Sequence, residues 1–229
     1  EVYFNGINGR TAGRIAGAEI TLDGTTYALT KNNGEHMLHG GNQGFNDKVW
    51  DVEEVSEQHI RLHYLSVDGE EGFPGNLHVY VTYIVEGGDL IIKYEANTDK
   101  TTILNLTNHA YFNLNGEGNG NILGHVLRLN ASEYLPTTDS LIPLGESAPV
   151  AGTPMDFVNE KVIGAEIKAD YPALNFGKGY DNCWVIDGAE PGQLQEAAQL
   201  YAPESGRVLT VYTTQPGVQV YTGNWLAGS

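Results

Sequence analysis

Apolar and polar residues alternate at every second position along much of this chain. From Leu77 to Val85 the odd positions read Leu, Val, Val, Tyr and Val, and from Leu90 to Ala96 the even positions read Leu, Ile, Tyr and Ala. Side chains that point alternately to opposite faces are typical of β-strands, so both runs predict strands. The sequence Glu86-Gly87-Gly88-Asp89 between them predicts that they pair as an antiparallel hairpin.

Two more hairpins are indicated by turn residues. Asp23-Gly24 separates residues 20–22 from 25–27, and Asp-Gly favours a type I′ turn. Ser205-Gly206 separates residues 199–202 from 207–213 in the same way. A helical pattern is visible only at residues 160–169, where we expect a short helix. The sequence therefore predicts an all-β chain, a large antiparallel β-sandwich that forms a single domain over residues 1–229.

The charge of the chain excludes several classes of partner. Its 29 acidic and 12 basic residues give a net charge of −17, which repels the phosphate backbone of nucleic acids. Anionic membranes and multiply phosphorylated ligands are disfavoured for the same reason, whereas a neutral sugar is compatible. The single cysteine, Cys183, rules out an intrachain disulfide and is consistent with the cytoplasm. No apolar run is long enough to cross a membrane, and the sequence gives no oligomeric state.

A histidine follows the apolar run Ile103, Leu104 and Leu106, in the segment Thr107-Asn108-His109-Ala110-Tyr111-Phe112-Asn113-Leu114. A histidine at the end of a strand is a suitable proton donor near neutral pH, so His109 is the candidate acid. The alternative is a buried histidine bonded to the backbone. Tyr111 and Phe112 would face opposite sides of a continued strand, so that one of them lines a pocket.

A second histidine, His39, lies in a loop-like stretch over residues 32–41. We expect Gly40 and Gly41 to let the backbone approach a ligand closely, with His39 bonding a sugar hydroxyl. An alternative is a metal site at His36, His39 and Glu35, but a spacing of three is poor for two ligands on one strand. Two ordinary loop histidines are the third possibility.

Carboxylates and amides supply the remaining candidates. Asp181 lies between a glycine-rich turn and an apolar strand, where it would accept from two sugar hydroxyls or simply cap the turn. Gln215, Gln219 and Tyr221 surround Pro216-Gly217, and neutral amides and hydroxyls suit an uncharged polyol. Paired carboxylates such as the adjacent Glu70 and Glu71 can indicate glycosidase chemistry, but a solvated loop is the favoured interpretation.

These segments together resemble the aldose 1-epimerases (galactose mutarotases), in the order that the family has them. Further matches cover nearly the whole chain: Gly9-Arg10, Arg14-Ile15-Ala16, Gly44-Phe45, residues 68–75, Tyr134-Leu135-Pro136, Gly145 and Tyr221-Thr222-Gly223-Asn224. The resemblance implies a β-sandwich enzyme that interconverts the α and β anomers of free hexoses such as glucose and galactose, with no cofactor and no metal. It implies that His109 is the catalytic acid. It further implies that the substrate-binding residues are Arg14, His39, Tyr111, Asp181 and Gln215.

The chain departs from the family pattern at two points. The family usually has Asn before the residue that matches Arg14, whereas Gly13 stands here, so one polar contact to the sugar is expected to be lost. The family's catalytic base is a glutamate in a Leu-Glu-Thr-Gln segment beyond Tyr-Thr-Gly-Asn, and no such segment occurs between Glu1 and Ser229. We therefore expect that both ends of the family's domain are missing from these residues, and that residues 1–229 alone are inactive.

Three other functions stay open at this point. The first is a non-catalytic sugar-binding or sensing protein that kept the pocket and lost the base. The second is a phosphosugar epimerase relative, which needs basic residues around the pocket, where only Arg10 and Arg14 are near. The third is a metal-dependent isomerase.

Overall fold

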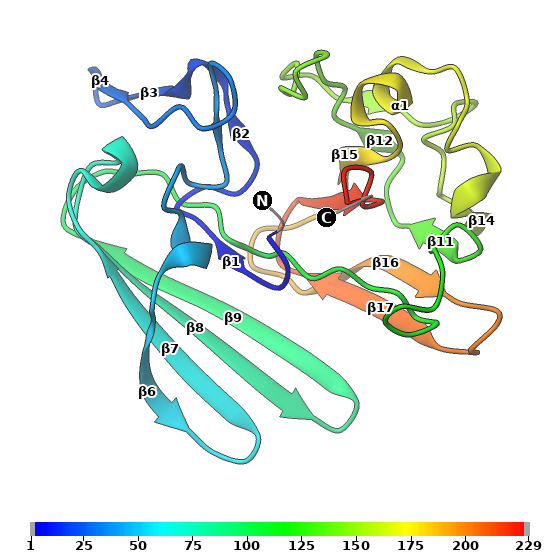
Figure 1. Cartoon of the computed structure of the whole chain (residues 1–229), viewed down its shortest axis with the longest axis horizontal. Helices are drawn as coiled ribbons and strands as arrows, with labels where there is room; N and C mark the ends of the chain where they lie inside the picture. The colour runs from blue at the N-terminus through cyan, green and yellow to red at the C-terminus, as the bar shows by residue number, and fades with distance from the viewer. Residues whose placement is uncertain (1–2, 227–229) are drawn as a thin grey trace. The chain divides into compact units, whose positions relative to one another are not determined.

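The computed structural model describes residues 3–226 and consists almost entirely of short and long strands (Figure 1). All pairings between its named strands are antiparallel. The predicted all-β class is thus confirmed. The expectation about the ends at Glu1 and Ser229 lies outside the described residues.

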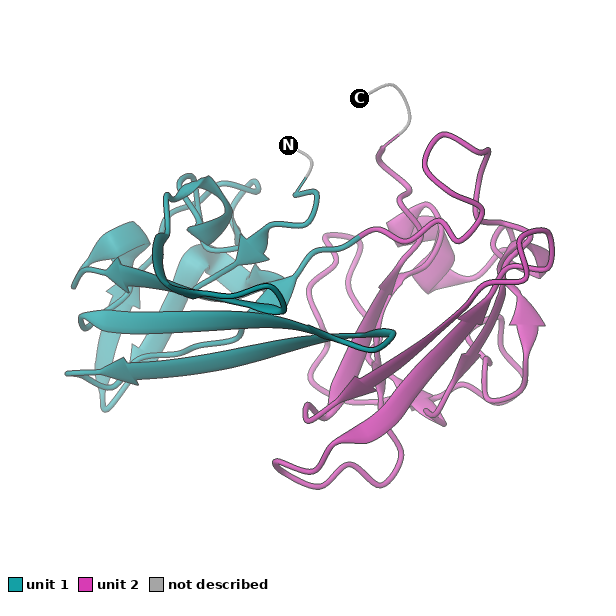
Figure 2. Ribbon diagram, turned by 90° about the horizontal axis from the view of Figure 1, so that it is seen from below, with its two compact units in different colours: residues 1, 3–110 teal, residues 2, 111–229 magenta. Residues whose placement is uncertain are grey.

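Two compact units make up the chain, divided between Ala110 and Tyr111 (Figure 2). We call them unit 1 and unit 2 and describe each by itself. The single domain over residues 1–229 stays a prediction.

Unit 1 is organised around a four-stranded sheet with the strand order β6-β7-β8-β9, accompanied by the two-stranded pairs β1-β10, β2-β5 and β3-β4. Its strands are β1 (Ile7–Asn8), β2 (Arg14–Ile15), β3 (Glu19–Leu22), β4 (Thr25–Ala28), β5 (Met37–Leu38), β6 (Asp51–Val55), β7 (His59–Ser66), β8 (Leu77–Glu86), β9 (Asp89–Thr98) and β10 (Thr107–Asn108). Short 3-10 turns cover Ala16–Ala18, Phe45–Asp47 and Glu70–Gly72.

The alternating pattern of β8 determines which face of this sheet is buried. Leu77, Val79 and Val81 are almost completely buried and pack with Ile7 and Phe45 in one core cluster. The β8-β9 hairpin turns where Glu86 pairs with Asp89, as the sequence predicts.

The predicted type I′ turn is also present in unit 1. It joins β3 to β4, with φ of 48° at Asp23 and 79° at Gly24. Both central residues of such a turn need positive φ angles, which is why Asp-Gly suits this position.

Unit 2 contains two four-stranded sheets with the orders β14-β11-β16-β17 and β13-β12-β15-β18. Its strands are β11 (Val126–Leu129), β12 (Glu133–Tyr134), β13 (Ala148–Pro149), β14 (Lys161–Val162), β15 (Asp181–Val185), β16 (Gln195–Tyr201), β17 (Val208–Thr213) and β18 (Gly217–Tyr221). Residues of both sheets share one buried cluster, which includes Leu129 of β11 and Trp184 of β15. The predicted third hairpin is β16-β17.

The helix predicted over residues 160–169 is wrong. Lys161–Val162 form β14 and pair with β11, and only Ile163–Ala165 make a 3-10 turn. The amide of Gly164 donates to the carbonyl of Leu123 at 2.9 Å, a distant partner that the local pattern does not reveal. The described α-helix is α1 (Pro172–Gly177), which begins at a proline, a residue favoured in the first helical turn. Within residues 3–226, no helix combines the length and the apolar character needed to span a bilayer.

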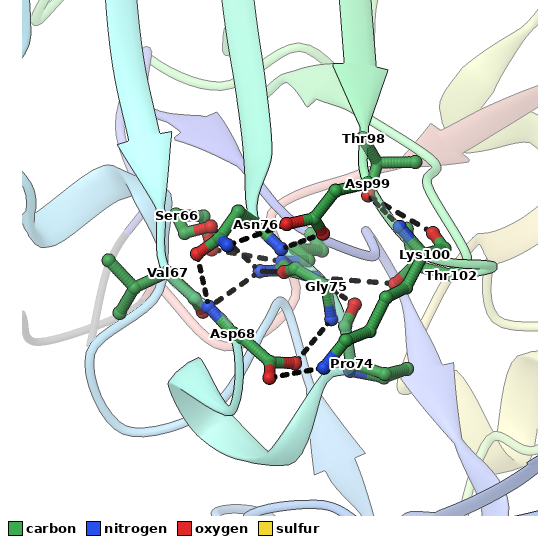
Figure 3. A network of polar contacts seen from close by, with 11 residues as sticks. Ser66, Val67, Asp68, Pro74, Gly75, Asn76, Thr98, Asp99, Lys100 and Thr102 are labelled. Atoms are coloured by element: carbon green, nitrogen blue, oxygen red, sulfur yellow. Dashed lines mark hydrogen bonds and ion pairs between the residues drawn. The ribbon is translucent and has the colours of Figure 1, made fainter.

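A buried arginine holds together the loop that follows β7. Arg10 is 1% exposed, and its guanidinium donates to Ser66 Oγ at 2.9 Å and to the carbonyls of Pro74 and Gly75 at 2.8 Å each. Figure 3 shows these carbonyl groups together with Asp68, whose carboxylate accepts from the amide of Gly75 at 2.6 Å. Arg10 is therefore part of the internal framework of unit 1.

Candidate functional site

His39 and His109 lie next to each other in unit 1, although 69 residues separate them in the numbering. His109 directly follows β10; its amide donates to the carbonyl of Gly6, and its own carbonyl accepts from the amide of Asn5, both at 2.9 Å. His39 directly follows β5. The two imidazole rings meet edge to face, with their centroids 5.2 Å apart and an interplanar angle of 82°.

The ring of Tyr3 contacts both histidines. Its centroid lies 4.6 Å from that of His39 and 5.9 Å from that of His109, and it stacks on the latter at an interplanar angle of 26°. The three rings form what we call the histidine cluster. Nothing in the sequence near Tyr3 identifies it as part of a site, because only the pairing of β1 with β10 places Asn5 and Gly6 beside His109.

A backbone hydrogen bond determines the protonation state of His39. The amide of Gly13 donates to His39 Nδ1 at 3.1 Å, so Nδ1 carries no hydrogen and Nε2–H is the available donor. Burial, and next the charges of His109 and Arg14, lower the pKa of His39 from its usual 6.5 to about 3. His39 is therefore a neutral hydrogen-bond donor.

This arrangement makes the stability of the protein depend on pH. Between pH 3 and pH 6.5 the unfolded chain binds a proton at His39 that the folded chain does not, so stability falls as the pH falls through this window. We expect His39 to contribute a loss of about 2 kcal/mol in the free energy of unfolding between pH 7 and pH 5.

Urea unfolding of the wild type and of His39→Gln at both pH values measures this contribution. The glutamine oxygen can still accept from Gly13, but the side chain does not titrate, so the pH dependence of the variant should be weaker by about that amount. Equal pH dependence in both proteins would contradict a neutral His39.

The alternative metal site at His36 and His39 gains no support from the hydrogen bonds of their imidazole nitrogens. His36 Nδ1 accepts from the amide of Gly17 at 3.0 Å, so both histidines use Nδ1 for the backbone. In the part of the chain that the structure describes, no three His, Cys, Asp or Glu side chains are grouped as metal ligands.

Gly40 and Gly41 are both needed for close packing within the protein, and their approach to a ligand stays a prediction. A Cβ atom at Gly40 would lie 1.7 Å from the carbonyl oxygen of Gly9, and one at Gly41 would lie 2.1 Å from Glu71 Oε2. Both residues have positive φ angles, 90° and 103°. They are glycines because the loop that carries His39 packs against the backbone after β1 and against a carboxylate.

The adjacent glutamates are not a solvated loop, contrary to the favoured interpretation. Glu71 accepts from the amides of Asn42 and Gln43 at 3.0 and 3.1 Å, so it supports the loop of His39. The Glu70 side chain is 14% exposed and accepts from Tyr64 and Lys48. Burial alone would raise the pKa of Glu70, but the bonds from Lys48, Ser66 and Tyr64 outweigh it and lower this pKa. Both carboxylates thus have structural partners that explain them.

Arg14 lies on β2, directly opposite Leu38 of β5, and is therefore close to His39 in the strand register. Its Nε donates to Asn33 Oδ1 at 3.1 Å. Gly13 has a φ of 77°, and a Cβ atom at this position would meet no other atom within 4 Å. No protein group therefore occupies the place of the family's asparagine among the described residues.

The other candidates lie in unit 2, around the first residues of β15. Asp181 is directly opposite Tyr221 of β18, and its Oδ1 accepts from Gln219 Nε2 at 2.8 Å. The rings of Tyr221 and Tyr111 meet at 68° with centroids 5.9 Å apart. Asp181, Gln219, Tyr221 and Tyr111 form what we call the aspartate cluster.

Gln215 is not part of the aspartate cluster. It follows β17 in an exposed turn, where its amide donates to Thr213 Oγ1. Gly217, two residues later, pairs with Val185 at the far end of β15 from Asp181. Gln219 has the position beside Asp181, and the strand register that shows this cannot be read from the sequence. The role of Gln215 in substrate binding stays a prediction.

Phe112 does not lie on a strand, contrary to the expectation. It is 51% exposed, and the structure has no strand at Tyr111 and Phe112, so the expected alternation does not apply to them.

The turn before Asp181 is held by close packing and by Asn224. Gly179 has a φ of 144°, and a Cβ there would lie 2.3 Å from Asn224 Oδ1. Asn224 Nδ2 donates to the carbonyls of Gly177 and Tyr180 at 2.9 Å each, which holds the turn in front of Asp181.

The histidine cluster and the aspartate cluster thus each bring together predicted residues from separate parts of the chain. His39, His109 and Arg14 belong to unit 1, and Tyr111 and Asp181 belong to unit 2. That both clusters serve one sugar stays a prediction.

Comparison with known proteins gives one consistent family. The sequence model of the family described as aldose 1-epimerase matches residues 1–229. A galactose mutarotase of Sus scrofa is 44% identical over 227 residues, which cover 99% of this chain and 64% of the relative. An aldose 1-epimerase of Escherichia coli (strain K12) is 38% identical, over 96% of this chain and 63% of its own length. The chain thus spans less than two thirds of the length of both relatives.

Two solved structures of aldose epimerase relatives are also similar to this chain. The crystal structure of a galactose 1-epimerase from Lactobacillus acidophilus matches with a TM-score of 0.84 and 31% identity, over 97% of this chain and 65% of that one. An aldose epimerase homologue from C. elegans matches with a TM-score of 0.87 and 28% identity, over 98% of this chain and 67% of that one.

Proposed function

Because the chain belongs to the aldose 1-epimerase family, we propose that the protein containing these residues interconverts the α and β anomers of free aldohexoses, galactose or glucose. The relatives named above are a galactose mutarotase and an aldose 1-epimerase. The reaction opens the sugar ring and closes it from the other face of the aldehyde, which needs proton transfers and no cofactor.

The observation that carries this proposal is the histidine cluster. His39 offers a neutral N–H in a fixed tautomer, and His109 lies at a ring-centroid distance of 5.2 Å from it. A neutral donor can bond a sugar hydroxyl or ring oxygen without repelling a proton on its neighbour. His109 is then the group that protonates the ring oxygen as the bond from that oxygen to the anomeric carbon breaks.

In the reverse direction the same groups exchange roles. His109 takes the proton back from the ring-forming hydroxyl as that oxygen attacks the aldehyde carbon. The base that took the proton of the anomeric hydroxyl during ring opening returns it to the aldehyde oxygen during closure. The family resemblance places this base in a Leu-Glu-Thr-Gln segment. Acid and base each contribute about 10²- to 10⁴-fold to such proton transfers.

The aspartate cluster suits the recognition of hydroxyl groups. Asp181 Oδ1 is held by Gln219, and a carboxylate has further lone pairs that can accept from a sugar. The nearby Tyr111 and Tyr221 rings offer apolar faces for the C–H groups of a sugar ring. We propose that Asp181 and Gln219 bind the substrate, in addition to Gln215, whose role the family resemblance implies.

The charges near the candidates favour an unphosphorylated sugar over a phosphosugar. Arg10, one of the two nearby arginines, is buried and its donors are used by Ser66, Pro74 and Gly75. The net charge of −17 opposes a phosphate as well. A cytoplasmic location is part of the same proposal and is supported by the single cysteine.

We expect Asp181→Asn to raise the KM for galactose about tenfold or more. The change removes the charge but keeps the shape, and a hydrogen bond to a charged group contributes about 1.5–3 kcal/mol. The matched control is Asp187→Asn, since Asp187 follows the other end of β15 and accepts from Ser132. An equal effect of both substitutions on KM would argue against Asp181 as a sugar ligand.

Polarimetry of freshly dissolved α-galactose and α-glucose tests the proposed activity. The gene product containing residues 1–229 should speed the approach to the equilibrium rotation in proportion to its concentration. Binding of galactose without any acceleration would instead favour a non-catalytic sugar-binding protein. If the protein neither binds galactose nor accelerates the interconversion, the proposal is refuted.

A further inference from the structure

The turn that carries His39 has a strained backbone. It runs from Leu38 to Gly41, and the amide of Gly41 donates to the carbonyl of Leu38 at 3.2 Å. The two central residues, His39 and Gly40, both have positive φ angles, of 51° and 90°. Glycine adopts such angles at no steric cost, whereas a residue with a Cβ atom adopts them rarely. His39 therefore has a conformation that the surrounding contacts must stabilise.

One asparagine side chain bonds both ends of this turn. Asn32 Oδ1 accepts from the amide of Leu38 at 2.7 Å, and Asn32 Nδ2 donates to the carbonyls of Leu38 and Gly41 at 2.9 Å each. These bonds use the acceptor and the donor group of one planar amide. The side chain of Asn32 thus fixes the residue before His39 and the second residue after it.

Other contacts hold His39 itself and the chain after the turn. The amide of His39 donates to the carbonyl of Gly13 at 3.0 Å, and its Nδ1 accepts from the amide of Gly13 at 3.1 Å. Glu71 accepts from the amides of residues 42–43. Asn32 adds the link between the two ends of the turn, which neither Gly13 nor Glu71 supplies.

We propose that Asn32 is a positioning residue of the sugar site, which holds His39 in the left-handed conformation in which it bonds the substrate. The identity of the ligand rests on the proposed function, but the bonds to the turn do not. A change of φ at His39 would swing its imidazole away from that of His109, whose centroid lies 5.2 Å away. A misplacement of about 1 Å in an active site can cost about 100-fold in rate.

The pattern of donors and acceptors explains why an asparagine suits position 32. Alanine would remove all three bonds to the turn. Aspartate would keep the acceptor for the amide of Leu38 but would place a second oxygen against the carbonyls of Leu38 and Gly41. Both substitutions should release the turn, and Asn32→Asp does so with almost no change in the size of the side chain.

The test compares Asn32→Asp and Asn32→Ala with the wild type and with a matched control, Asn76→Ala. Asn76 also holds a loop of unit 1, because its Oδ1 accepts from the amide of Asp68 at 3.0 Å and its Nδ2 donates to Asp99 at 2.7 Å. It belongs to neither the histidine cluster nor the aspartate cluster. Circular dichroism checks folding, and the isosteric Asn32→Asp carries the test if Asn32→Ala does not fold.

Two quantities are measured for each protein. Polarimetry with galactose gives kcat/KM, and an NMR titration of the imidazole C–H signals between pH 5 and pH 8 gives the protonation of His39. Burial, and next the charges of His109 and Arg14, lower the pKa of His39 to about 3, so the wild-type ring should stay neutral over this range. The titration needs no sugar and therefore reports the position of His39 independently of activity.

We expect both Asn32 variants to lower kcat/KM about 10- to 100-fold. Their His39 ring should titrate within this pH range, because a released imidazole is hydrated and its pKa rises toward the usual 6.5. Asn76→Ala should change neither quantity, even if urea unfolding shows that it destabilises the protein as much.

Wild-type values of kcat/KM and of the His39 titration in Asn32→Asp would overturn the proposal. Equal changes in Asn76→Ala would also overturn it, since they would reflect a general loosening of unit 1. If the wild type does not accelerate mutarotation, the proposed function fails, and the His39 titration alone decides whether Asn32 positions this histidine.

Discussion

His109→Asn is expected to lower the kcat of anomer interconversion by about 10²- to 10⁴-fold, with little change in galactose binding. Asparagine keeps a hydrogen-bonding side chain of similar size but cannot donate and regain a proton near neutral pH. His109 is held by its backbone bonds to Gly6 and Asn5 at 2.9 Å, so the substitution should leave the loop in place. Steady-state polarimetry gives kcat and KM, and calorimetry gives the affinity for the sugar.

The matched control is His59→Asn, since His59 is a strand histidine bonded to Ser56 in the same unit. It should not change kcat, because His59 belongs to neither cluster. A defect of His109→Asn that is confined to KM would mean that His109 binds the sugar and is not the acid. Full activity of the variant would remove His109 from the reaction.

The largest expected effect on stability is that of Arg10→Lys, a loss of about 3–5 kcal/mol in the free energy of unfolding. The guanidinium of Arg10 supplies donors in a planar fork to Ser66, Pro74 and Gly75 in the interior of unit 1. A single ammonium cannot reach all of these acceptors, and each buried acceptor left unpaired costs about 1–3 kcal/mol.

Urea unfolding of Arg10→Lys and of the control Arg61→Lys measures the loss in the free energy of unfolding of each variant. Arg61 is 24% exposed and pairs with Glu53 and Glu95 on the sheet surface, where an ion pair contributes about 0–1 kcal/mol. Equal and small losses in both variants would contradict a structural role for Arg10. They would also reopen the question of whether Arg10 is available to a phosphate.

Strands that depend on local alternation could be predicted from the sequence. β8 and β9 contain the runs 77–85 and 90–96 whose apolar residues recur at every second position, and a turn with two glycines separates them. The local pattern and the observed pairing therefore agree. The false helix over residues 160–169 shows the limit of this approach. Val162 pairs with Val126 of β11, a partner far away along the chain, and that pairing outweighs the local helical preference.

The candidate residues could be identified largely from the family resemblance, but their partners could not. The tautomer of His39 depends on the amide of Gly13, a donor that every non-proline residue has. Gln219 bonds to Asp181 because of the register of β18 against β15. A shift of one residue would turn the Gln219 side chain to the other face of the sheet. The burial of Glu70 depends on Lys48 and Tyr64, which precede it along the chain by 22 and 6 residues.

The central claim is that this protein transfers protons to and from a free sugar through His109. Exchange spectroscopy by NMR on galactose at anomeric equilibrium measures this directly, because it detects the interconversion of the two anomers without an added reagent. We predict that the gene product containing residues 1–229 increases the exchange rate, that His109→Asn abolishes at least about 99% of this increase, and that His63→Gln retains it. An unchanged exchange rate with the wild type, or an increase that survives His109→Asn, would contradict the account.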